Sequence, residues 1–133
     1  MDAHVKNVVR EMSKASDEER ITFPEVVKAL TEVGIERYHT DLVAARKTYY
    51  LPDGDFEETQ SYKAGGAALE FSPEGVEKAL RAIQRHEIGY REFCRRITGA
   101  GCVGYLVSFA GRRAVYCGRT GDQYVEWFPG ARP

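Results

Sequence analysis

The feature that most constrains the fold of this chain is an internal repeat. When residues 21–55 are shifted by 67 positions they lie on residues 88–122 without a gap, and nine of the 35 aligned positions are identical. Ordinary composition would give about two identities by chance. The identical pairs are Ile21/Ile88, Glu25/Glu92, Thr31/Thr98, Gly34/Gly101, Tyr38/Tyr105, Arg46/Arg113, Tyr49/Tyr116, Gly54/Gly121 and Asp55/Asp122. We therefore expect two copies of one folding unit; the alternative is a coincidence between two common amphipathic patterns.

Four segments have the apolar spacing of an amphipathic helix. Apolar residues recur at i, i+3, i+4 and i+7 within residues 5–12, 23–30, 76–83 and 90–97. Thr22 and Glu25 form a capping box before the second segment, and Ser72 with Pro73 is a typical helix start before the third. Gly34 is a C-cap candidate after the second segment. Each copy is therefore predicted to begin with two helices.

The apolar period changes to two after each pair of helices. The predicted strands are residues 36–43, 46–51 and 56–62 in the first copy and 102–109, 113–118 and 123–128 in the second. We therefore predict an α+β fold, a tandem duplication of an α-α-β-β-β unit in which an antiparallel sheet has helices packed on one face. A chain of 133 residues suits one core. The prediction is a single domain, 1–133, with repeats over 1–64 and 67–133.

Strand alternation assigns side chains to the two faces of the sheet. In the first copy the predicted outer face, away from the helices, is polar, with His39 opposite Tyr50; it holds Arg37, His39, Asp41, Thr48 and Tyr50. In the second copy the predicted outer face is apolar and holds Leu106, Val115, Cys117, Tyr124 and Phe128. Such a face is unusual in contact with water. We expect it to meet the other copy, a second protomer or a ligand.

Two functions from different classes follow from these faces. The leading hypothesis is a small interaction or regulatory module that acts as a homo-oligomer, most simply a dimer, through the apolar group, because homodimers are the commonest assembly. The alternative is a binding protein or enzyme that holds a small anionic ligand on the polar group. There Asp41 can set the tautomer and raise the basicity of His39, although an ordinary solvated sheet face has the same composition.

The charge distribution suggests a third function. The chain carries 19 basic and 20 acidic residues, which gives no general reason to expect nucleic-acid or membrane binding. Residues 81–96, however, hold five arginines against two glutamates. Nucleic-acid binding through this segment is the third alternative; we do not favour it, because no recognised binding signature accompanies the arginines.

The sequence contains no pattern that is typical of a disulfide framework, a metal site or a cofactor. Its cysteines, Cys94, Cys102 and Cys117, are odd in number and form no C-x-x-C pair. The histidines are scattered along the chain. A secretory h-region and an apolar stretch of about 18 residues are both missing. We therefore expect reduced thiols, no metal, no cofactor and a cytoplasmic location.

Several short motifs together resemble a known family. They are Arg37-Tyr38-His39-x-Asp41-Leu42, Thr48-Tyr49-Tyr50, Gly118-Arg119-x-Gly121 and Val125-Glu126-x-Phe128-Pro129. The chain is similar, from Ile21 onward, to an uncharacterised bacterial family that is also found in prophages and is often labelled "phage envelope protein". The resemblance implies a compact domain of unknown function and brings no reaction, cofactor or catalytic residue with it.

Overall fold

The structure is a computed structural model that describes residues 1–131. The first repeat consists of α1 (Ala3–Asp17), α2 (Phe23–Glu32), β1 (Arg37–Asp41), β2 (Arg46–Tyr50) and β3 (Phe56–Gln60). The second consists of α3 (Pro73–Gln84), α4 (Tyr90–Gly99), β4 (Cys102–Ser108), β5 (Arg113–Gly118) and β6 (Gln123–Trp127). Each of the ten predicted elements is present, and the last two residues of the predicted second repeat, 132 and 133, lie outside the described residues.

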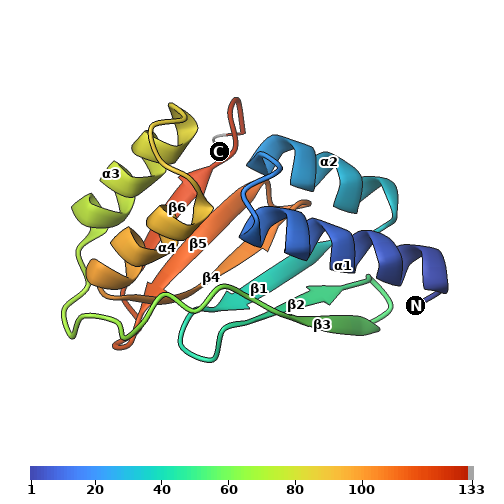
Figure 1. Cartoon of the computed structure of the whole chain (residues 1–133), viewed down its shortest axis with the longest axis horizontal. Helices are drawn as coiled ribbons and strands as arrows, with labels where there is room; N and C mark the ends of the chain where they lie inside the picture. The colour runs from blue at the N-terminus through green and yellow to red at the C-terminus, as the bar shows by residue number, and fades with distance from the viewer. Residues whose placement is uncertain (132–133) are drawn as a thin grey trace.

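The strands form one six-stranded antiparallel sheet in the order β3-β2-β1-β4-β5-β6. The three strands of each repeat are neighbours, and the two halves join at the centre where β1 pairs with β4. The four helices lie on the same face of the sheet, α1 and α2 over the first half and α3 and α4 over the second (Figure 1). This arrangement confirms the predicted α+β fold.

The backbone repeats as closely as the sequence. Four residues of the first repeat have a positive φ, and the residue 67 positions later has one too. The pairs are Glu19/His86, Gly34/Gly101, Ala45/Arg112 and Gly54/Gly121. The ring centroids of Tyr38 and Tyr49 are 5.1 Å apart at 33°, and those of Tyr105 and Tyr116 have the same separation and angle. The duplication is therefore real, and the coincidence is excluded.

The predicted helix starts are present, and one start connects the two repeats. Glu25 accepts from the backbone N–H of Thr22 at 3.0 Å, which completes the capping box. Helix α4 begins after Gly89, which has no side chain to cap it. Its N-terminus instead receives the carboxylate of Glu19 from the first repeat, which accepts from the backbone N–H of Arg91 at 3.4 Å. A Cβ atom on Gly89 would lie too close to that carboxylate, so a larger residue here would push the Glu19 side chain away from the helix end.

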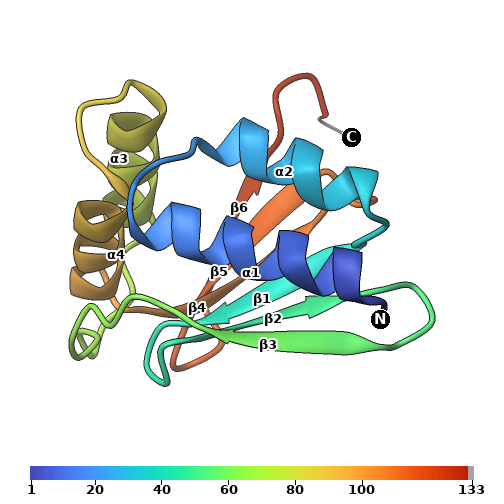
Figure 2. The same cartoon turned by 45° about the vertical axis from the view of Figure 1, so that its right-hand side comes forward.

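The core lies between the helices and the inner face of the sheet. Its largest fully buried side chains include Leu30, Leu42, Tyr49 and Ile97. On the other face of the sheet no helix packs within residues 1–131 (Figures 1 and 2). In the same part of the chain no helix is long and apolar enough to span a membrane.

The first hairpin has the predicted faces but a different register. His39 lies opposite Thr48, and Tyr50 lies opposite Arg37 rather than His39. The loop sets this register, because Asp41 Oδ1 accepts from the backbone N–H groups of Val43 and Ala44 and closes a four-residue turn. A shift of two residues keeps the same side chains on each face, so the predicted faces survive.

The predicted faces of β6 were wrong. Tyr116 lies opposite Tyr124, so Tyr124 points to the helical side, where its hydroxyl donates to Glu77 of α3 at 3.1 Å. Phe128 packs edge-on against Phe23 of α2, with ring centroids 5.7 Å apart. The sequence predicted Tyr124 and Phe128 on the outer face, but the pairing of β6 with β5 gives the opposite alternation. Tyr124 and Phe128 are thus not part of the outer face.

Candidate ligand-binding cleft

The polar residues predicted as a binding group are brought together on the outer face of β1 and β2, but two of them have structural partners. Arg37 stacks on the ring of Tyr50, 3.9 Å from its centroid, and pairs with Glu36 at 3.2 Å. Asp41 closes the turn described above. His39 is exposed between Thr48 and Leu106. The group therefore forms an open surface in which the carboxylate and the guanidinium are already engaged.

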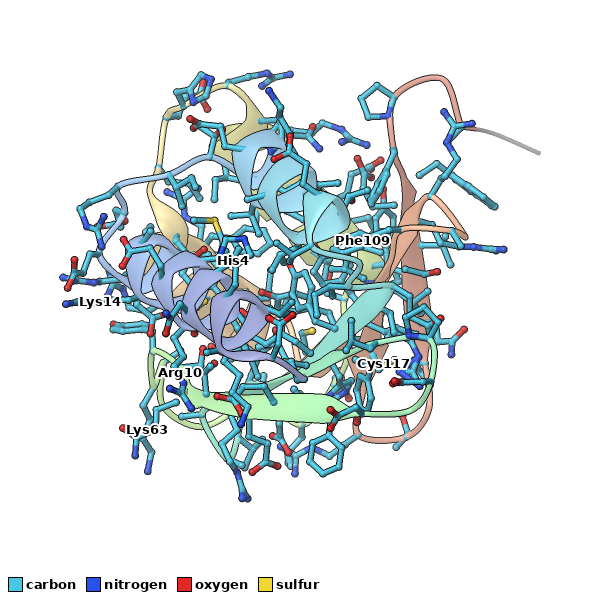
Figure 3. The ribbon with its side chains drawn as sticks, turned by 90° about the vertical axis from the view of Figure 1, so that its right-hand side faces the viewer. His4, Arg10, Lys14, Lys63, Phe109 and Cys117 are labelled. Atoms are coloured by element: carbon cyan, nitrogen blue, oxygen red, sulfur yellow. The ribbon has the colours of Figure 1, made fainter. Side chains whose placement is uncertain are left out.

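The apolar outer face is smaller than predicted and is placed on β4, β5 and β6. Leu106, Val115 and Cys117 lie there as predicted and are half-buried. Val125 and Trp127 join them, because their strand partners are Val115 and Arg113. Figure 3 shows the molecule from the side with Cys117 labelled. Burial raises the pKa of the Cys117 thiol, so nothing activates it as a nucleophile.

A cleft lies on the opposite face, between the two helical pairs. This cleft of about 1550 Å³ runs from the α1–α2 connection to α3 and the start of α4, with the sheet as its floor. Figure 2 shows the two helical pairs standing apart above the central strands. Both repeats contribute: the cleft lies over the β1–β4 junction where the two halves of the sheet meet.

Aromatic side chains from both repeats line this cleft. The floor contains Tyr38, Tyr105 and Tyr116, each 4–5% exposed, and Tyr38 and Tyr105 are in edge contact at 6.4 Å. Burial raises the pKa of each of these tyrosines, so their hydroxyls stay protonated. At the rim stand Phe23, which is 44% exposed, and Phe128. The walls therefore offer flat apolar surface with a few hydroxyl groups.

A polar network holds the α3 wall of the cleft. Glu126 of β6 accepts from Arg81 at 2.7 and 3.2 Å and from Gln84 at 3.0 Å. The hydroxyl of Tyr124 also donates to Glu126 at 3.2 Å. Burial alone would raise the pKa of Glu126, but these hydrogen bonds hold it below its usual value. Arg81 and Glu126 thus neutralise each other in the wall.

One buried charged side chain in the cleft has no such partner. Lys47 of β2 is 3% exposed, and within residues 1–131 its amine makes no hydrogen bond or ion pair. Its Nζ lies 4.4 Å from the ring centroid of Tyr90, whose hydroxyl is 2.8 Å from that of Tyr105. Burial lowers the pKa of Lys47, while the nearby Asp17 acts in the opposite sense. A desolvated lysine in a cleft is a typical functional group.

Sequence reasoning missed Lys47 although the signal was present. Lys47 precedes Tyr49 by two residues and so shares its face, which the alternation correctly assigned to the helices. Because a lysine is almost never fully buried, the sequence did not lead us to expect Lys47 in the core. The equivalent residue in the second repeat is Ala114, a small apolar side chain of the kind that is usual in a core.

The arginine-rich segment does not form a free basic surface. Arg81 pairs with Glu126, and Arg95 and Arg96 both pair with Glu92. Arg91 donates to the backbone oxygen of Asp17 at 2.9 Å. Four of the five arginines are therefore engaged in contacts within the protein. The structure offers no support for the nucleic-acid alternative.

Metal and thiol chemistry find no support in the described residues either. No group of three His, Cys, Asp or Glu side chains that could hold a metal ion occurs within residues 1–131. Cys94 and Cys102 are buried, and burial raises the pKa of each thiol to about 11. They behave as small apolar core residues.

No protein-family model matches the chain, and no curated protein is significantly similar to it in sequence. The resemblance to the prophage-related family therefore rests on the short motifs alone, and the functional argument rests on the cleft.

Proposed function

We propose that this protein binds a small, flat, largely apolar organic molecule in the cleft between its two helical pairs. The observation that carries the proposal is the lining: aromatic rings from both repeats converge on one concave space above the β1–β4 junction. Ligand sites are typically concave and mostly apolar, with few polar groups that fix orientation. Pockets for drug-sized ligands measure roughly 300–1000 Å³. The ligand therefore occupies part of this cleft.

The rim offers a direct test of binding. Phe23 and Phe56 are both exposed phenylalanines, but Phe23 stands at the cleft and Phe56 on the outer face. N-phenyl-1-naphthylamine, a neutral aromatic dye whose fluorescence rises in apolar surroundings, serves as the probe. We expect Phe23→Ala to weaken its binding about tenfold, which corresponds to about 1.4 kcal/mol of lost aromatic contact. The matched variant Phe56→Ala should leave the affinity unchanged.

Fluorescence titration of the natural chain, Phe23→Ala and Phe56→Ala with the dye tests whether the cleft is the binding site. A dye that fails to bind the natural chain, or that binds Phe23→Ala and Phe56→Ala equally well, would show that the cleft is not a binding site. Circular dichroism of each variant checks that the fold is retained.

A second candidate function is self-association through the outer face of β4, β5 and β6. The observation that favours it is one continuous apolar row, Leu106, Val115 and Val125, which are direct neighbours across three strands with no helix over them. In the first repeat the equivalent row is polar and contains His39. A second copy of the chain suits this row, because a twofold axis places identical apolar patches against each other.

Sedimentation over a wide concentration range tests the second candidate. Leu106→Glu puts a charge into the apolar row, and His39→Glu puts the same charge at the equivalent position of the other repeat. We expect the natural chain to dimerise, Leu106→Glu to be monomeric and His39→Glu to dimerise like the natural chain. A monomer at all concentrations would end this proposal.

A further inference from the structure

We infer that the ligand of the cleft carries an oxyanion, such as a carboxylate, and that Lys47 binds it at the floor. This inference rests on the proposed binding function and names the chemistry of the molecule that the cleft accepts. It is built on a comparison within the chain, because the second repeat shows what the same positions contain when they serve the fold alone.

Lys47 and Thr40 form a buried polar pair on neighbouring strands. Thr40 of β1 lies directly opposite Lys47 of β2, and the two are 0% and 3% exposed. Thr40 Oγ1 makes no hydrogen bond within residues 1–131. The Lys47 amine makes none there either, as described above. Buried polar groups without partners cost free energy, so two of them side by side require an explanation.

The second repeat provides the control for this pair. The equivalent residues, Val107 and Ala114, also lie directly opposite each other, on β4 and β5, and are buried. The same backbone is therefore built there with two apolar side chains. Because the fold itself needs no polar group at these positions, the amine of Lys47, which lines the cleft, is free for binding.

The charges around the cleft indicate the sign of the ligand. Arg81 and Glu126 neutralise each other in the α3 wall, and Glu25 caps α2. Glu19 already occupies the N-terminus of α4. Lys47 then remains as a buried cation that makes no ion pair within residues 1–131; the acid that acts on it is the nearby Asp17, whose own pKa is raised by burial. An oxyanion would accept charge-assisted hydrogen bonds from the Lys47 amine.

Tyr90 controls access to the amine. Its ring lies against Lys47 Nζ at 4.4 Å, the position that a cation–π contact requires. Tyr90 is the first residue of α4 and is half-buried at the edge of the cleft, so an anion that reaches the amine has to displace its ring and the hydroxyl contact with Tyr105. The incoming anion takes the place of the Tyr90 ring beside the Lys47 amine, so the amine exchanges a cation–π contact for an ion pair. The displaced ring then adds to the aromatic wall around the ligand.

Two dyes with the same aromatic skeleton isolate the anion. 8-Anilinonaphthalene-1-sulfonate is N-phenyl-1-naphthylamine with one added sulfonate, so the ratio of their affinities measures recognition of the charge. We expect the natural chain to prefer the sulfonate by about tenfold, the effect of one charge-assisted hydrogen bond of about 1.4 kcal/mol. In Lys47→Met this preference should disappear while the neutral dye binds as before. Thr40→Val, which copies the second repeat, should keep the preference, because Thr40 does not line the cleft.

Lys14→Met is the matched control. Lys14 is exposed on α1 and points away from the sheet (Figure 3), so the variant removes the same charge from the chain without touching the cleft. The affinity ratio should stay at the natural value. A natural ratio near one, or a ratio that Lys47→Met leaves unchanged, overturns the inference even if the cleft binds both dyes. Failure of both dyes to bind the natural chain instead overturns the proposed function.

Discussion

His39 and Leu106 lie directly opposite each other at the centre of the sheet, and they occupy the same position in the two repeats. The pairing on either side of them is symmetric, because Arg37 lies opposite Ser108 and Asp41 opposite Gly104. A pseudo-twofold axis therefore passes between His39 and Leu106 and rises into the cleft. Each residue near the axis has an equivalent across it, so a difference between the two reveals a position with a special role.

Replacing Lys47 by methionine should stabilise the protein. The change removes a buried amine without hydrogen-bond partners, and such replacements typically raise the free energy of unfolding by about 1 kcal/mol or more. Because the pKa of folded Lys47 lies below its usual 10.5, the unfolded chain binds more protons, and the natural protein gains stability as the pH rises. The advantage of Lys47→Met should therefore shrink between neutral pH and about 10.5. Urea unfolding across this pH range measures the difference in free energy of unfolding between Lys47→Met and the natural chain. The control Lys14→Met should have the same free energy of unfolding as the natural chain.

Alkaline conditions should unfold the protein through its buried thiols and phenols. Burial raises the pKa of Cys94 and Cys102 from 9.0 to about 11, and raises that of Tyr38 well above 10.0. The folded chain thus binds more protons than the unfolded chain above pH 9. The stabilisation is complete below pH 9 and is lost as the pH rises through about 11, at up to about 1.4 kcal/mol per pH unit for each group.

Urea unfolding at several pH values follows this loss. Cys94→Val copies Val27, the equivalent residue of the first repeat, and removes one titrating thiol from the core. Its free energy of unfolding should fall less steeply above pH 9 than that of the natural chain. Equal slopes for the two proteins would contradict the assignment.

Glycine should stabilise the two hairpin turns equally. Ala45 and Arg112 have φ values of 58° and 54°, a conformation that costs an L-residue about 1 kcal/mol and costs glycine almost nothing. Ala45→Gly and Arg112→Gly should each raise the midpoint of thermal unfolding by several degrees. Ala44→Gly, one residue away and without a positive φ, should lower it. Opposite signs for Ala45→Gly and Arg112→Gly would contradict the repeat at this position.

The carboxylate of Glu19 should stabilise α4. It lies at the positive end of the helix dipole, where Gly89 supplies no cap. Glu19→Gln keeps the shape but removes the charge, and should lower the free energy of unfolding by about 0.5 kcal/mol, less at high salt. His86→Gln, at the equivalent position, is the control and should have no such salt-dependent effect.

Local patterns were sufficient to predict the elements and the topology. The capping box at Thr22 and the αL glycine at Gly34 bounded α2 correctly, because both signals are local to the chain. Local patterns could not predict which residues of β6 face the helices. Tyr124 and Glu126 lie on the inner face because α3 provides polar partners for them, Glu77 and Arg81. Hydrophobicity alone preferred Val125 inside, and only the partner helix reverses that preference.

The cleft was beyond prediction for a related reason. It exists because the two helical pairs stand apart over the β1–β4 junction, and no local pattern encodes that spacing. The aromatic residues of its floor were correctly assigned to the inner face, where the alternation places any core residue. Lys47 is the buried charged residue on that face, and it is the signal in the sequence that favours the proposed binding surface over ordinary packing.

The symmetric join of β1 and β4 means that the edge of one repeat is complementary to itself. Two separate chains of the single unit could meet along that edge and enclose the same space, but identical subunits would then present two lysines across the axis, repelling each other. When the two units are joined in one chain, the two equivalent positions no longer need to hold the same residue. In this chain the two equivalent positions hold Lys47 and Ala114, so the two sides of the cleft differ, and the proposed ligand, if it is asymmetric, would fit them in one orientation.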